Sequence, residues 1–270
     1  MKVHHINCAT LCPYGFSHMK TPGAKTDAMI AHCLVIETND GLVLVDTGFG
    51  LADIRDARGR LGGGFVNFAR PRLDENETAI RQIEKLGFKA SDVRHVLPTH
   101  LDLDHAGGLP DFPHAKVHMY AAEIAAALAR ATLRERERYR AAHFAHGPSW
   151  VRYDVRGERW FGFECVRDLE GLPPEILIVP LIGHTRGHSG IAVESDSGWL
   201  LHAGDAYFSY SEMHPETPSC PWPLAFFQNA VAIDNLARKR NSERLRILAR
   251  DEKVNVFSAH DAYELERFTE

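Results

Sequence analysis

The sequence has no hydrophobic run long enough to cross a membrane, and residues 1–7 alternate polar and apolar side chains. A spanning helix needs about 20 consecutive apolar residues, and a signal peptide needs a continuous apolar core, so we expect neither. The sequence also lacks an excess of positive charge, because 31 Lys and Arg residues stand against 36 Asp and Glu residues, for a net charge of -5. We therefore expect no binding to nucleic acid or to a membrane surface.

The cysteines do not form the pattern of a disulfide framework. They are odd in number and scattered, which is typical of reduced thiols in a cytoplasmic protein: Cys8, Cys12, Cys33, Cys165 and Cys220. No internal repeat, low-complexity segment or linker divides the 270 residues, and a hydrophobic content of 44% suits a sizeable core. The sequence predicts a single domain spanning residues 1–270. It gives no indication of oligomeric state.

What the sequence does contain is a dense polar cluster directly after the apolar run 93–97. The run predicts a buried strand, Pro98 ends its hydrogen-bond ladder, and the cluster would then lie on a loop. Isolated polar loop residues are usually turn formers. Two imidazoles and two carboxylates within six residues instead favour a metal site. These groups are suitable ligands for zinc, iron or manganese, and without a cation the carboxylates would repel one another. The four residues are His100, Asp102, Asp104 and His105.

Three further apolar stretches, 175–181, 198–201 and 254–257, also lead into histidine or aspartate. Polar side chains gathered at the ends of several buried strands are typical of a site built on a rigid scaffold. The residues that follow these stretches are His184 and His188, Asp205, and His260. Asp46 follows a fifth apolar strand, 42–45, where a turn cap and the orientation of a ligand histidine are equal alternatives.

The remaining elements are predicted from periodicity and turn residues. Strands are expected at 1–10, 28–37 and 115–119, helices at 75–86, 121–140, 231–249 and 261–270, and loops at 14–27 and 51–72. We interpret the alternating Arg and Glu residues of 134–138 as a solvated helix face, and the aromatic residues of 143–171 as core. The segment 214–227 would be an apolar wall beside the site or a loop packed on the core.

In order and spacing, these motifs resemble the metallo-β-lactamase-fold hydrolases. The resemblance rests on His100 to His105, Gly183-His184-Thr185-x-Gly187-His188, Gly204-Asp205 and Ala259-His260-Asp261, preceded by Val45-Asp46-Thr47-Gly48. It implies an α/β fold, the αββα sandwich, in which two mixed β-sheets are flanked by helices. It implies one metal ion held by His100, Asp102 and His184, and a second held by Asp104, His105 and His260, with Asp205 bridging them. His188 would hold its loop through hydrogen bonds.

The activity implied by the resemblance is hydrolysis by a metal-bound hydroxide. Two divalent ions would serve as cofactors, zinc first, with iron or manganese as alternatives. The family has histidine where this chain has Asp102, and a carboxylate there should weaken the Lewis acidity of the first ion, favour iron or manganese, or leave that position poorly filled. A carboxylate ligand at this position is also similar to the site of the flavodiiron oxygen reductases. A non-haem iron redox enzyme is therefore an alternative, although no flavin domain follows.

The layout is similar to the lactonase branch of the family, which opens N-acyl homoserine lactones, and this implies a small ester or lactone as substrate. In that branch a tyrosine three residues after the bridging aspartate polarises the carbonyl. Phe208 stands at that position here, and either of its neighbours, Tyr207 or Tyr210, would take its place. The candidate catalytic residues are Asp104, Asp205 and Tyr207, with Tyr210 as the alternative to Tyr207. A phosphodiesterase is a further alternative, but it would require a basic groove, and the net negative charge of the chain argues against one. A metal-binding protein without turnover would have the same ligands.

Overall fold

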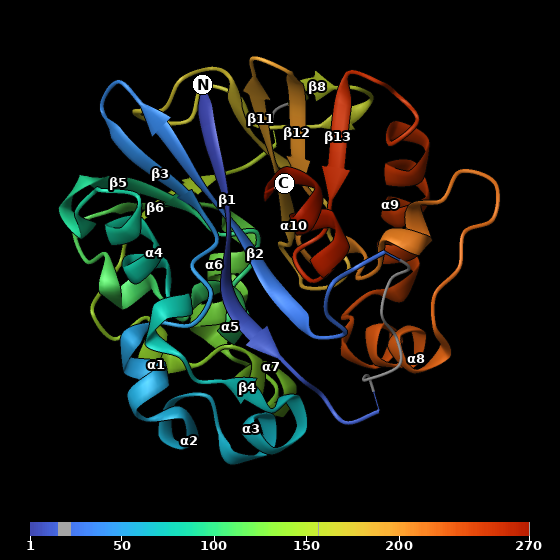
Figure 1. Cartoon of the computed structure of the whole chain (residues 1–270). Helices are drawn as coiled ribbons and strands as arrows, with labels where there is room; N and C mark the ends of the chain where they lie inside the picture. The colour runs from blue at the N-terminus through green and yellow to red at the C-terminus, as the bar shows by residue number, and fades with distance from the viewer. Residues whose placement is uncertain (16–22, 156, 270) are drawn as a thin grey trace.

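The computed structural model describes residues 1–15, 23–155 and 157–269. Two β-sheets lie face to face, and helices cover their outer sides (Figure 1). In Figure 1 the blue-to-green part of the chain forms one sheet with its helices, and the brown-to-red part forms the other. The predicted αββα sandwich is therefore confirmed. Residues 16–22 of the loop predicted at 14–27, and Glu270 of the tail, lie outside the described residues.

Within the described residues the larger sheet has seven strands. In spatial order they are β4 (Pro71–Arg72), β1 (Lys2–Leu11), β2 (Met29–Thr38), β3 (Gly41–Val45), β5 (Val93–Leu97), β6 (Lys116–Tyr120) and β7 (Ser149–Tyr153). The strands β1, β2 and β3 are antiparallel, whereas β3, β5, β6 and β7 are parallel. The parallel strands end at one edge of the sheet, and the polar cluster follows β5 there.

The smaller sheet has the order β10 (Ile176–Pro180), β11 (Ser189–Ser195), β12 (Gly198–His202) and β13 (Val254–Phe257). The strands β12 and β13 are parallel, so the residues that follow them meet at the same edge. A separate hairpin pairs β8 (Arg159–Trp160) with β9 (Phe163–Glu164).

The hydrophobic residues of the strands alternate between two cores. In β2, Cys33 and Val35 pack in the core beneath the helices, whereas Leu34 and Ile36 pack in the core between the sheets. In β10, Leu177 lies on the helix side and Ile178 lies between the sheets. Successive strand residues point to opposite faces, so a continuous apolar strand can fill both cores.

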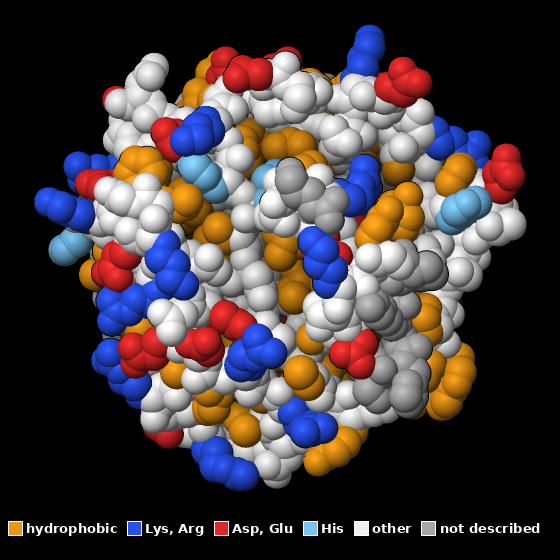
Figure 2. All heavy atoms as spheres, in the orientation of Figure 1, with side chains coloured by type: hydrophobic (Ala, Val, Ile, Leu, Met, Phe, Trp, Pro, Cys, Tyr) orange, Lys and Arg blue, Asp and Glu red, His pale blue; other side chains and the backbone are white. Residues whose placement is uncertain are grey.

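The helices α4 and α6 pack on the larger sheet, and α9 packs on the smaller one. The helices of the described residues are α1 (Leu51–Arg55), α2 (Ala57–Arg60), α3 (Gly63–Ala69), α4 (Ala79–Lys85), α5 (Leu103–Ala106), α6 (Ala121–Ala129), α7 (Leu133–Arg138), α8 (Trp222–Val231), α9 (Asn235–Leu248) and α10 (Ala262–Thr269). None of them combines the length and apolar character needed to cross a bilayer. On the face shown in Figure 2, acidic and basic side chains are interspersed.

Two predicted segments were wrong, and a third, 214–227, contains a helix that neither of its two alternatives specified. The loop expected at 51–72 contains α1, α2 and α3, which are short because glycine or aspartate caps separate them. The helix expected at 121–140 is broken into α6 and α7 at Arg130, which has a left-handed φ of 43°. Within 214–227, α8 begins at Trp222 although prolines surround it, because proline is compatible with the first turn of a helix.

A buried histidine of β6 should make the stability of the fold depend on pH. His118 Nδ1 is hydrogen-bonded to the Tyr153 hydroxyl at 2.8 Å, and its Nε2 is hydrogen-bonded to His95 Nδ1 at 2.7 Å. Burial, together with His95, lowers the pKa of His118 to about 3. Below pH 6.5 the unfolded chain takes up a proton at this residue that the folded chain does not, so stability falls as the pH falls from 6.5 towards 3.

We expect His118 to lower the free energy of unfolding by about 2 kcal/mol between pH 7 and pH 5. Each pH unit below 6.5 lowers that free energy by about 1.4 kcal/mol. Urea unfolding of wild type and His118→Gln at both pH values measures this difference. The variant should lose less stability on acidification than wild type does. An equal loss in both proteins would contradict the assignment.

Candidate metal centre

The seven side chains predicted to bind metal ions meet at one edge of the sandwich. They are His100 and Asp102 on the loop after β5, Asp104 and His105 on α5, His184 on the loop after β10, Asp205 on the short helix η5 (Gly204–Ala206) after β12, and His260 after β13. Because parallel strands of each sheet end at this edge, residues that are distant in the sequence become neighbours there.

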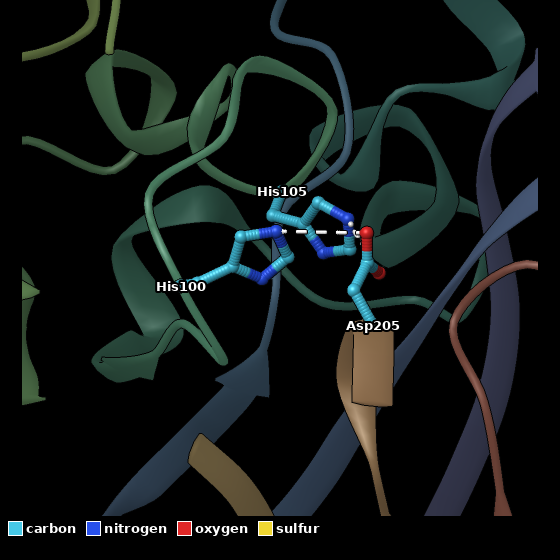
Figure 3. Close-up of side chains that lie close together, drawn as sticks. All are labelled: His100, His105 and Asp205. Carbon is cyan, nitrogen blue, oxygen red and sulfur yellow. Dashed lines mark ion pairs between the residues drawn. The ribbon is translucent and has the colours of Figure 1, made fainter. Parts of the chain in front are cut away.

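The carboxylate of Asp205 lies between two pairs of histidines. Its Oδ1 atom is 3.3 Å from His105 Nε2 and 3.1 Å from His260 Nε2. Its Oδ2 atom is 3.3 Å from His184 Nε2 and 3.7 Å from His100 Nε2. Figure 3 shows His100 and His105 turned towards this carboxylate. Each oxygen of Asp205 therefore faces a different group of ligand atoms.

These groups define two candidate positions. The first position is formed by His100, Asp102 and His184, and Asp102 Oδ2 is 3.0 Å from His184 Nε2. The second position is formed by Asp104, His105 and His260, and the oxygens of Asp104 lie 3.9 Å from each imidazole. Within each group the ligand atoms lie within 4.8 Å of one another. The structure thus brings together all seven predicted ligands.

The ligand atoms fit divalent cations. His100 Nε2, His105 Nε2 and Asp205 Oδ1 are buried and have no hydrogen-bond partner. A buried polar atom without a partner lowers the stability of the fold unless it forms a hydrogen bond or binds an ion. An ion with bonds of about 2.0–2.1 Å in tetrahedral geometry places its ligand atoms about 3.3 Å apart, which is close to the separations around Asp205. Imidazole nitrogens with carboxylate oxygens also form a donor set for zinc, iron or manganese.

Hydrogen bonds behind the site fix the orientation of the imidazoles. His105 Nδ1 donates to Asp46 Oδ2 at 2.8 Å, and Asp46 also accepts the Thr99 N–H at 2.7 Å. His260 Nδ1 donates to the carbonyl of Ile30 at 2.8 Å. In both histidines the hydrogen bond at Nδ1 leaves Nε2 facing the site. Metal-binding histidines are commonly oriented by such a hydrogen bond at the other ring nitrogen. Of the two alternatives for Asp46, the orientation of a ligand histidine is the one that the structure contains.

Two further buried residues hold the ligand loops. His188 accepts the Asp205 N–H at 2.9 Å, so its predicted loop-holding role is confirmed. Glu123 of α6 was not predicted. Its carboxylate accepts the N–H of Leu101 at 3.0 Å and that of Gly187 at 2.9 Å, and it thereby joins the loop of His100 to the loop of His184. The sequence signal for this role was a single charged residue, Glu123, within the alanine-rich segment 121–129.

The electrostatics of the site favour a positive charge beside Asp205. Burial alone would raise the pKa of Asp205, but the surrounding histidines hold it well below its usual range. Burial alone would lower the pKa of His105, but Asp205 and Asp46 raise it well above its usual value. The carboxylates around His105 thus favour a positive charge at this point of the site.

The predicted catalytic role of Tyr207 has no support in the structure. Its side chain is fully buried, and its hydroxyl donates to Glu264 at 2.7 Å, away from the ligand atoms. Phe208, the next residue, lines the cavity instead, because consecutive residues of this extended segment point to opposite sides. Tyr210 packs against Tyr263 and does not line the cavity either.

The charged run of α7 is not a uniformly solvated face. The side chain of Arg138 is only 8% exposed, and its Nε atom is 3.2 Å from Asp102 Oδ1. Glu135 is also buried and pairs with Arg186 at 2.8 Å. The alternating charges predicted a solvated face, but the side of this helix that carries Arg138 faces the metal centre.

A cavity of about 400 Å³ opens over the site. Its floor contains carboxylates and imidazoles of both positions, and Arg134, Glu137 and Arg138 lie on its side. The rest of its wall is apolar and is formed by Leu11, Pro13, Met29, Leu61, Phe65, Phe68, Ala69, Leu103, Phe208, Phe227, Ala230 and Val231. The cavity can therefore hold a small molecule with an apolar arm against the ligand atoms.

Comparison with known proteins agrees with this geometry. Residues 26–260 match the family model described as the metallo-beta-lactamase superfamily. A protein of Mycobacterium tuberculosis named as a probable metallo-hydrolase is 40% identical over 273 residues, which cover 100% of this chain and 84% of that protein. An N-acyl homoserine lactonase of Bacillus thuringiensis is 26% identical over 245 residues, which cover 89% of this chain and 84% of that protein.

Solved structures show the same fold. A structure of an N-acyl homoserine lactone hydrolase, with the product N-hexanoyl-L-homoserine bound at its catalytic metal centre, aligns with a TM-score of 0.72. The alignment covers 98% of this chain and 95% of that one, at 20% sequence identity.

Proposed function

Because this chain belongs to the metallo-beta-lactamase superfamily and is a metal-dependent hydrolase, we propose that it binds two divalent cations and hydrolyses small esters or lactones that carry an apolar arm. The observation that carries the proposal is the carboxylate of Asp205, which presents one oxygen to each ligand group at the floor of an apolar cavity. The lactonases among the relatives support the choice of substrate class.

Each part of the cavity has a role in this proposal. Bound divalent cations would lower the pKa of a water towards neutrality and polarise the carbonyl under attack. Asp205 sets the relative placement of the two positions, and Asp104 presents a second carboxylate to the same space. Phe208 and Phe227 would bury the apolar arm of the substrate and exclude water from it.

The test combines elemental analysis with hydrolysis assays. Protein purified without chelators or a metal-binding tag should contain about two divalent ions per chain, with zinc expected. It should hydrolyse N-acyl homoserine lactones and simple aryl esters, lose this activity on chelation and regain it with added zinc. Each additional methylene of the acyl arm should raise kcat/KM by about fourfold until the cavity is full, because a buried methylene contributes about 0.8 kcal/mol.

Two outcomes would overturn the proposal. Protein without a transition metal would remove the basis of the mechanism. A preference for an aryl phosphodiester over every ester and lactone would assign the site to phosphodiester hydrolysis.

A further inference from the structure

Arg138 lies at the junction of three segments around the first position. Its Nε atom is 3.2 Å from Asp102 Oδ1. Its two terminal nitrogens donate to backbone carbonyls, at 2.7 Å to His184 and at 2.8 Å to Val231. A guanidinium is a planar group with several donors in a fixed arrangement, so the two hydrogen bonds define its orientation and hold its charge beside Asp102. Arg138 therefore contacts two of the three residues of the first position.

The carboxylate of Asp102 is divided between two environments. Its Oδ1 atom faces Arg138, whereas its Oδ2 atom is 3.0 Å from His184 Nε2 and 3.4 Å from His100 Nε2. One oxygen thus forms an ion pair with the guanidinium without a hydrogen bond, and the other is directed at the ligand atoms of the first position.

The charge of Arg138 also matters, because the centre is rich in carboxylates. Asp102, Asp104 and Asp205 all line the cavity floor. An aspartate and a buried arginine form a pair whose net charge is zero. In net charge, the Asp102–Arg138 pair therefore equals a neutral histidine. The weaker Lewis acidity expected from Asp102 alone would then be offset by its partner.

We propose that Arg138 is a positioning residue for the first position, where it directs Asp102 Oδ2 to the cation and neutralises the charge of that carboxylate. The inference rests on the proposed metal site. It assigns a role in metal binding to a residue that the alternating charges of α7 had marked as solvated. Its action is through Asp102 and His184 and not through contact with the cation.

A purely structural role for Arg138 makes a different prediction. If Arg138 only ties the His184 loop to the end of α8, its removal should have the same effect whichever residue stands at position 102. If it acts through Asp102, the effect of its removal should depend on that carboxylate. A double-mutant cycle separates these cases, because it measures the coupling between two residues.

The experiment compares wild type, Arg138→Met, Asp102→His and the double variant Asp102→His/Arg138→Met. Arg138→Lys, which keeps the charge but lacks the planar set of donors, is a second variant of the same residue. Arg134→Met is the matched control, because Arg134 lies one helical turn away, lines the same cavity and has a hydrogen bond to the carbonyl of Ala232. Zinc affinity is measured by competition with a chromophoric chelator, and thermal unfolding of the metal-free proteins verifies their folding.

The expected signature is a reversal of sign. With Asp102 present, Arg138→Met should weaken the weaker of the two zinc-binding steps by about 10–100-fold, as the loss of outer partners does in metal sites. With histidine at position 102, the same change should strengthen zinc binding, because it removes a buried cation that has lost its carboxylate partner. Arg138→Lys should fall between wild type and Arg138→Met, and Arg134→Met should bind zinc as wild type does.

The outcomes distinguish the inference from the function on which it rests. Wild-type protein that binds neither zinc nor any other divalent transition metal would overturn the proposed function. Wild-type protein that binds two zinc ions, with Arg138→Met acting equally in both backgrounds or having no effect, would leave the function standing and overturn the role of Arg138.

Discussion

Asp205→Asn is expected to lose at least one of the two proposed cations and to reduce kcat/KM by about 10³-fold or more. The asparagine keeps the size of the side chain but removes its charge, and its nitrogen would face histidines that now face a carboxylate oxygen on each side. Removal of a single preorganised donor from an active site costs about 10²–10³ in kcat, and loss of a cation also removes the means of activating water. Elemental analysis and lactone hydrolysis measure the two effects.

The control for this variant is Asp261→Asn. Asp261 follows the same strand end as His260, but its carboxylate accepts the N–H groups of Tyr210 and Tyr263. This variant removes a negative charge near the centre without removing a ligand, so it should retain about two ions per chain. If Asp205→Asn also retained two ions and normal activity, the bridging role of Asp205 would be refuted.

The second large effect is expected from Glu123→Ala. Glu123 is fully buried and accepts the N–H groups of Leu101 and Gly187, which lie on the two ligand loops of the first position. Alanine would leave both donors without an acceptor, at a cost of about 1–3 kcal/mol each. For a chain of this size the total corresponds to a decrease in Tm of roughly 5–15 °C. We also expect weaker zinc binding, because the loops lose their common support.

Glu123→Gln is the matched variant for this experiment. It preserves the volume of the side chain and one acceptor oxygen, so its Tm should lie between those of wild type and Glu123→Ala. Thermal unfolding of the metal-free and zinc-loaded proteins separates the effect on the fold from the effect on the centre. An alanine variant with the wild-type Tm in both forms would show that the two hydrogen bonds contribute nothing.

The ligands could be predicted from the sequence because each follows directly from a recognisable strand. An apolar run such as 93–97 predicts a buried strand, and the next residues must then lie at its end. Parallel strands end at a common edge, so four such segments are expected to meet. The order of the motifs supplied the resemblance to a known family, and with it the αββα sandwich.

Contacts between distant segments could not be predicted in the same way. The alternating charges of α7 are the same whether Arg138 faces water or Asp102, and only the break at Arg130 turns this helix onto the centre. The direction of Tyr207 depends on the acceptor that Glu264 provides 57 positions later in the chain. Local sequence determines which elements form, whereas these side chains depend on how the elements pack.

Each candidate metal position draws its ligands from both sheets of the sandwich. At the first position, His184 and Asp102 are 82 residues apart in the chain, and they come from loops of different sheets. A bound cation would therefore crosslink two distant parts of the chain and close a long loop, as a disulfide does in an oxidised protein. The described cysteines form no disulfide. The cations would then serve as reversible staples, and metal loss would loosen the contact between the two sheets.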